Sequence, residues 1–148
     1  MFLGVLKIQE VYRVMDANFN RAREGLRVLE EISRFVLEDK DLSGTIKDLR
    51  HKLAKTIKEL PGGMLELVQA RDAAGDVGAG SWTLGERTRS DLFALAVANF
   101  KRVQEAARVL EEFSKLITPG VEGFKKIRFE TYVLEQEMLI KIALREPS

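Results

Sequence analysis

Apolar residues recur every three or four positions along most of the chain, which is the spacing of a helix that turns one face toward a core. The pattern predicts four long helices, over about residues 11–37, 44–60, from between 83 and 90 to 117, and 121–144. The stretches 61–63 and 118–120 contain proline and glycine, which end helices, and we place the first break at Asp41, Ser43 and Gly44. We therefore expect an all-α protein.

One stretch of the chain occurs twice. DANFNRAREGLRVLEEISRFV, residues 16–36, is matched about eighty residues later by ANFKRVQEAARVLEEFSKLI, residues 98–117. Arg50 in the helix after the first copy corresponds to Arg128 after the second, so the repeated unit is a helix pair. We expect a single domain, 1–148, built as a helical bundle of two such pairs with pseudo-twofold symmetry. Repeat one covers about 11–60, a glycine-rich central loop about 61–86, and repeat two about 87–145.

The first copy carries polar residues on both sides of its helix. Asn18 and Arg21 fall in the sector of the apolar face, which includes Leu26, Leu29 and Val36. Their counterparts, Asn99 and Arg102, do the same in the second copy. Polar groups at such positions need partners, so they form either a structural network or a ligand site. Arg27, Glu30 and Arg34 fall on the opposite side, where we expect ordinary surface ion pairs.

Composition excludes several classes of protein. The 148 residues include 24 basic and 23 acidic side chains, a balance that creates no broad field for nucleic acid or an anionic membrane. There is no cysteine and a single histidine, His51, which excludes thiolate zinc sites and His-rich metal sites. The short apolar start lacks the features of a signal peptide, and we expect a cytoplasmic protein. Apolar residues near the N-terminus, Phe2, Leu3, Val5 and Leu6, are candidates for a homodimer contact.

The segment from Arg71 to Asp91 is the irregular, glycine-dense part of the chain. Gly75 and Gly78 allow backbone N–H groups to turn toward an anion. The guanidinium groups of Arg71, Arg87 and Arg89 can each donate two parallel hydrogen bonds, which suits phosphate oxygens. Hard oxygen ligands for Mg²⁺ come from Asp72, Asp76 and Glu86. These residue types suit phosphoryl transfer, although a flexible linker with incidental charge would have the same composition.

Three motifs in this order resemble one bacterial family: DANFNRAREGLRVLEE, then RDAAGDVG with ERTRSDL, then ANFKRVQEAARVLEEFSK. The family is the small hydroxymethylpyrimidine phosphate kinase domain, which occurs alone or fused ahead of thiamine phosphate synthase. The resemblance covers about residues 11–139. It implies transfer of the γ-phosphate of ATP to 4-amino-5-hydroxymethyl-2-methylpyrimidine phosphate, with Mg²⁺, giving the diphosphate that the synthase consumes in thiamine biosynthesis. It also makes the synthase a candidate partner.

Residue roles under this reading are hypotheses. The candidate catalytic residues are Arg21, Arg102, Arg71, Asp76 and Arg87. The candidate substrate- and nucleotide-binding residues are Asn18, Asn99, Glu24, Glu105, Gly75, Gly78 and Arg89. The candidate metal ligands are Asp72, Asp76 and Glu86. The alternative is a non-catalytic domain that binds a phosphate metabolite or docks onto the synthase, which would favour a contiguous apolar patch on an outer helix face. The densely charged outer faces of the repeats disfavour docking.

Overall fold

A computed structural model of the chain describes residues 2–81, 83–119 and 121–145. Its helices are α1 (Ile8–Glu31), α2 (Lys40–Lys58), α3 (Gly63–Ala70), α4 (Leu84–Arg87), α5 (Leu92–Ser114) and α6 (Gly123–Ala143). One turn of π-helix, η1 (Ile32–Val36), extends α1, and the two-residue strands β1 (Phe2–Leu3) and β2 (Leu6–Lys7) pair antiparallel near the N-terminus. The all-α prediction is confirmed. None of the helices that the described residues form is long and apolar enough to span a bilayer.

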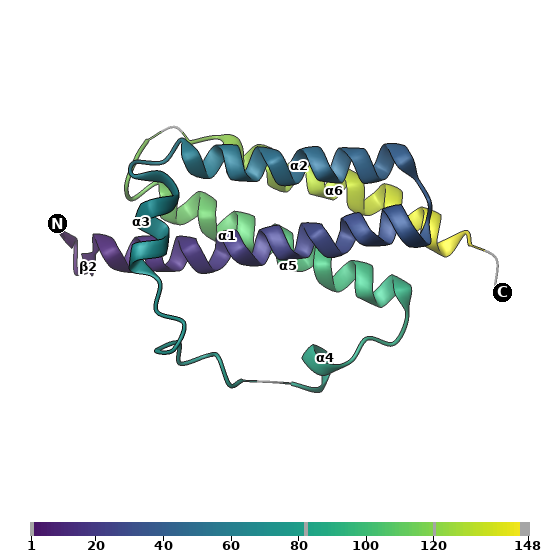
Figure 1. Cartoon of the computed structure of the whole chain (residues 1–148), viewed down its shortest axis with the longest axis horizontal. Coiled ribbons are helices and arrows are strands. Elements are labelled where there is room, and N and C mark those ends of the chain that lie inside the picture. The colour runs from purple at the N-terminus through teal and green to yellow at the C-terminus, as the bar shows by residue number, and fades with distance from the viewer. Residues whose placement is uncertain (1, 82, 120, 146–148) are drawn as a thin grey trace.

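The four long helices form a bundle in which α1 lies along α5, α2 covers α1, and α6 covers α5 (Figure 1). The α1–α5 crossing is close because α1 carries Gly25 there. A Cβ at Gly25 would lie 2.7 Å from Cγ2 of Val103 and 3.2 Å from the carbonyl oxygen of Asn99. Fully buried side chains such as Leu26 and Phe100 fill the space between the helices. The resulting scaffold holds α1 and α5 side by side, with residues of both at one surface.

The structure corrects two predicted helix boundaries and settles one stretch that the sequence left undecided. The break after the first helix lies at residues 37–39, before Gly44, because Asp39 caps α2 by accepting a hydrogen bond from the backbone N–H of Leu42 at 2.9 Å. The undecided stretch 64–71 is mostly helix α3, which follows Gly62 in a left-handed conformation with φ of 78°. The central segment ends at Asp91, which caps α5 through the N–H of Ala94 at 2.7 Å.

The two helix pairs are joined by equivalent charged contacts. Nε of Arg50 lies 3.0 Å from Glu30, linking α2 to α1, and Nη2 of Arg128 lies 3.0 Å from Glu111, linking α6 to α5. Glu30 and Glu111 are buried, so the expected surface position of Glu30 was wrong: the second helix of the pair covers that side of α1. These contacts fit a repeated helix pair, while exact pseudo-twofold symmetry stays a prediction.

Two further positions depart from the expected helix faces. Val36 was expected on the core face but is 39% exposed, because it lies in η1, where the π turn changes the phase of the helix. At the N-terminus, Val5 is fully exposed, and it stays a candidate for a homodimer contact. The side chains of Phe2 and Leu3 lie outside the described part of the structure.

Candidate active site

The described residues of the segment between Arg71 and Asp91 leave α3, arch outward below α1 and α5, and return through α4 to the start of α5 (Figure 1). Its described residues between 71 and 81 are all exposed. Two adjoining cavities lie between this segment and the helices. We call them the α5-side cavity, about 670 Å³, whose lining includes residues of α5, and the α1-side cavity, about 660 Å³, lined by α1 and the segment alone. Asn18, Arg21 and Asp76 line both.

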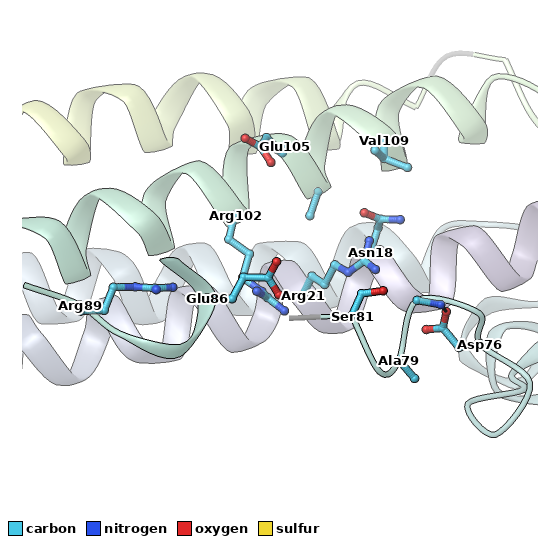
Figure 2. Close-up of a pocket in the computed structure, with 12 residues that line it drawn as sticks. Asn18, Arg21, Asp76, Ala79, Ser81, Glu86, Arg89, Arg102, Glu105 and Val109 are labelled. Atoms are coloured by element: carbon cyan, nitrogen blue, oxygen red, sulfur yellow. Dashed lines mark hydrogen bonds between the residues drawn. The ribbon is translucent and has the colours of Figure 1, made fainter. Parts of the chain in front are cut away.

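The α5-side cavity brings together arginines from both repeats. Arg21 of α1 and Arg102 of α5 line it together with Arg89. Figure 2 shows the side chains of Arg21 and Arg102 between the helices and the segment, near Glu86, with Arg89 to one side. Both Arg21 and Arg102 are exposed, so their expected placement on the core face was wrong; each side chain is long enough to leave the bundle. Within the described part of the chain, neither guanidinium has a hydrogen-bond or ion-pair partner.

Arg89 lies in the same cavity but is held by the backbone. It donates to the carbonyl oxygens of Gly85 and Thr88, the latter at 3.0 Å. These acceptors carry no formal charge, so the positive charge of Arg89 remains available to an anion. The cavity therefore contains three guanidinium groups that form no ion pair within the described chain, although Asp76, Glu86 and Glu105 also line it; unpaired guanidinium groups of this kind suit phosphate oxygens.

The α1-side cavity is organised by a residue that the sequence analysis missed. Asp16 of α1, whose side chain is 5% exposed, accepts hydrogen bonds from Nε and Nη2 of Arg71 at 2.7 and 2.8 Å. These bonds and the charge of Asp16 raise the pKa of the Arg71 guanidinium above its ordinary value. Arg13 donates to the carbonyl oxygen of Asp72 at 3.1 Å. Together these contacts tie the start of the irregular segment to α1.

Asp16 had one weak signal in the sequence, which was its place at the head of the repeated stretch. Its counterpart in the second copy is Val97, so the repeat itself gave no reason to select it. Its partner, Arg71, was selected for its charge and lies 55 residues away along the chain. Only the packing of the segment against α1 brings the two together.

The three candidate metal ligands do not form one cluster. Asp76 and Glu86 line the α5-side cavity, whereas Asp72 lines only the α1-side cavity. Asp72 and Asp76 each accept a backbone N–H within the segment, from Gly75 at 2.9 Å and Gly78 at 2.8 Å. In the described residues, no three His, Cys, Asp or Glu side chains are grouped to hold a metal ion. Mg²⁺ commonly takes one or two protein carboxylates plus substrate phosphates, and either Asp76 or Glu86, which lie apart in the cavity (Figure 2), could supply one such carboxylate.

The other predicted site residues divide between the cavities. Glu105 and Gly78 line the α5-side cavity, Glu24 and Gly75 line the α1-side cavity, and Asn18 lies on their common wall. Arg87 and Asn99 line neither of these two cavities. The amide of Asn18 donates to the carbonyl of Val14 at 2.8 Å, and that of Asn99 donates to Leu95 at 2.9 Å, so both side chains are oriented by their own helices.

Comparison with known proteins places this architecture in a family. The ThiD2 family matches residues 13–137. The chain belongs to this family. It is 46% identical over 132 residues, 88% of its length, to the thiamine-phosphate synthase of Nostoc sp. (strain PCC 7120). It is 45% identical over 133 residues, 89% of its length, to that of Thermosynechococcus vestitus, and 40% identical over 134 residues, 90% of its length, to that of Rhodopirellula baltica.

The alignments with these thiamine-phosphate synthases cover only part of each relative. The chain spans 36% of the Nostoc and Thermosynechococcus proteins and 35% of the Rhodopirellula protein, which is about a third of their lengths. No solved structure matches the chain.

Proposed function

We propose that this ThiD2 chain is an ATP-dependent kinase of thiamine biosynthesis. It would phosphorylate 4-amino-5-hydroxymethyl-2-methylpyrimidine phosphate to the diphosphate. The pathway is supported by the relatives, which are named thiamine-phosphate synthase. The kinase reaction rests on one observation. Arg21 and Arg102, from the two repeats, line a single cavity with Asp76 and Glu86 and have no partner among the described residues.

The proposed reaction needs little acid–base chemistry. An oxygen of the acceptor phosphate attacks the γ-phosphorus, the bond from that phosphorus to the β–γ bridging oxygen breaks, and ADP leaves with the electron pair. The acceptor oxygen carries no proton when the monophosphate is fully ionised, so no general base is required. His51, exposed on α2 and outside both cavities, has no part in this reaction.

The principal requirement is to bring two anionic phosphates together. Uncompensated arginines do this by neutralising phosphate charge and holding it in position, and such electrostatic terms dominate phosphoryl transfer. Arg21 lies where both cavities meet, so it can contact the donor and the acceptor at once. Asp76 or Glu86 would supply a carboxylate ligand to Mg²⁺ on the α5 side. When bound, Mg²⁺ neutralises charge on the donor phosphates.

The test is a coupled assay with ATP, Mg²⁺ and either the pyrimidine monophosphate or the free alcohol. We expect turnover of the monophosphate alone. Loss of Arg21 or Asp76 to alanine should lower kcat by about 100-fold or more, the usual cost of removing a group that stabilises developing charge. Arg23→Ala is the matched control, because Arg23 is exposed on the same helix and lines neither cavity. Failure of well-folded protein to turn over the monophosphate would refute the proposal.

Docking onto the synthase is the second candidate function, and one observation favours it. Contrary to the expectation of charged outer faces, α6 exposes Phe129, Val133 and Ile140 by 52%, 65% and 52% on one side of the helix. Phe129 also contacts Tyr132 edge to face, with ring centroids 5.8 Å apart. The relatives carry a further two-thirds of chain that this sequence does not span, and that portion is the proposed occupant.

Calorimetry can test docking with the remaining portion of the Nostoc protein, made separately, as the probe. Val133→Glu should abolish binding because it places a charge in the apolar contact. Lys55→Glu, on the outer side of α2, is the control and should bind like the unmodified chain. Equal affinity of both variants, or no binding by the unmodified chain, would rule out this surface.

A further inference from the structure

The two cavities adjoin along one wall. Asn18, Arg21 and Asp76 contribute to both linings, whereas Arg102 belongs only to the α5-side cavity and Arg71 only to the α1-side cavity. Two ligands that occupy the cavities at the same time would therefore meet beside Arg21. Reactions between two bound molecules require this kind of contact, with the reacting atoms held close together.

The cavities differ in the charge available to a ligand. On the α5 side, Arg21, Arg89 and Arg102 share the lining with three carboxylates, those of Asp76, Glu86 and Glu105, but form no ion pair in the described part of the chain. On the α1 side, three arginines share the lining with four carboxylates, and the charge of one arginine, Arg71, is already matched by Asp16 in a two-point contact. A ligand with several phosphates is therefore better accommodated on the α5 side.

The α1-side cavity also has the groups that an aminopyrimidine would use. Such a ring carries a hydrogen-bond donor in its amino group, acceptors in its ring nitrogens, and apolar faces. Asn20 and Glu24 supply polar partners, and Val14 and Val77 supply apolar contact. Arg71 uses Nε and Nη2 for Asp16, so Nη1 is left to meet a single phosphate.

We propose that the α5-side cavity binds the polyphosphate of a nucleoside triphosphate and that the α1-side cavity binds the pyrimidine monophosphate, with Arg21 between the two phosphate groups. This assignment rests on the proposed kinase function and adds the location of each substrate. In it, Asp16 is a positioning residue, because it acts on the monophosphate through Arg71.

Equilibrium binding separates the two sites without requiring turnover. The probes are Mg·ADP and the pyrimidine monophosphate, titrated separately by calorimetry. Arg102→Ala should weaken Mg·ADP about 10- to 100-fold, the worth of a charged hydrogen-bonding group, and leave the monophosphate within about 2-fold. Arg71→Ala should show the opposite pattern. Arg108→Ala on α5 and Arg23→Ala on α1 line neither cavity and should bind both probes normally.

The same series of variants includes a control for effects on folding. Arg71→Ala leaves the buried Asp16 without its partner, so the double variant Asp16→Ala with Arg71→Ala provides a version free of that charge. It should show the same selective loss of monophosphate binding. Asp16→Asn, which keeps the shape of the side chain, should raise the KM for the monophosphate with little change in the KM for ATP.

The other possible results show whether the site assignment, the proposed kinase function, or both are wrong. If Arg102→Ala weakens the monophosphate and Arg71→Ala weakens Mg·ADP, the assignment is reversed while the kinase proposal stands. If both variants weaken both probes equally, a single common site replaces the two. Selective binding without any phosphoryl transfer would support the assignment and refute the kinase. A folded, unmodified chain that binds neither probe would overturn both.

Discussion

Replacing Arg128 by methionine should destabilise the fold more than the same replacement of Arg50. Each arginine joins the two helices of one pair through a buried glutamate. Glu111, the partner of Arg128, has a side chain 9% exposed, and Glu30, the partner of Arg50, has one 6% exposed. Methionine preserves most of the apolar volume but removes the charge, leaving each glutamate buried beside an uncharged side chain.

The magnitude depends on which other cations are near each glutamate. Removing one member of a buried ion pair costs about 3–5 kcal/mol when nothing compensates the charge that remains. Glu30 keeps Arg27, whose Nη1 lies 3.4 Å away, whereas the equivalent Arg108 lies 3.9 Å from Glu111. Arg128 also makes two bonds to Glu111, at 3.1 and 3.0 Å. We therefore expect the free energy of unfolding to fall by about 3–4 kcal/mol in Arg128→Met and by about 2–3 kcal/mol in Arg50→Met.

Urea denaturation followed by circular dichroism at the helix band measures both values, provided that the slope of each transition is unchanged. The control is the double variant Glu111→Leu with Arg128→Met, which replaces the whole pair by apolar groups. Its free energy of unfolding should lie within about 1 kcal/mol of that of the unmodified chain, because no unpaired charge is left. The reasoning fails if the double variant is as unstable as Arg128→Met, or if Arg50→Met is the more damaging change.

Three further predictions concern other parts of the fold. Gly25→Ala should cost about 1–3 kcal/mol, because its Cβ would lie 2.7 Å from a side-chain carbon of α5, whereas Gly44→Ala, with nothing within 4 Å, should stabilise α2 by about 0.5–1 kcal/mol in the same urea experiment. The hydrogen bond from the backbone N–H of Leu42, followed by the one from Lys141 of α6, lowers the pKa of Asp39 in the folded protein. Asp39 therefore adds to the free energy of unfolding above its unfolded pKa near 3.9, and this stabilisation is lost as the pH falls through the lower folded pKa. The unmodified chain should therefore be more stable than Asp39→Ala by about 1 kcal/mol at pH 7, and this difference should shrink from pH 5 to pH 3. Urea denaturation across that pH range measures it. Arg71→Ala should lower the melting temperature more than Asp16→Ala, since Arg71 is 43% exposed and can turn to water when its partner is removed, whereas Asp16 cannot; an equal fall for both would contradict this.

Hydrophobic period was sufficient to predict the helices because most of their stability comes from one apolar face per helix. Leu26, Leu49, Phe100 and Met138 are all buried, one on each of the four long helices. The period could not show which side of a helix a second helix would cover. Glu30 lies opposite the α1–α5 contact and is buried all the same, because α2 packs over it and supplies Arg50 as its partner.

The candidate site was predictable where its residues were close in sequence or were repeated. Arg21, Arg102, Asp76, Glu86 and Arg89 were selected on charge and repeat, and the structure places all of them around one cavity. Asp72 was selected on the same grounds but lines the other cavity. The distinction could not be made from composition, because it depends on the path that the irregular segment takes over α1 and α5.

Under the proposed kinase function, residues that are not repeated have to distinguish the two substrates. Each repeat brings one arginine and one glutamate to the cavities, Arg21 and Glu24 from α1 and Arg102 and Glu105 from α5, and the same residue types alone cannot distinguish a nucleotide from a pyrimidine phosphate. The difference comes from residues that occur once. Asp16 has Val97 as its counterpart, so only the α1 side holds an arginine already matched by a buried carboxylate. A kinase requires two different sites, and in our proposal the pairing of Arg71 with the buried Asp16 makes the two cavities different.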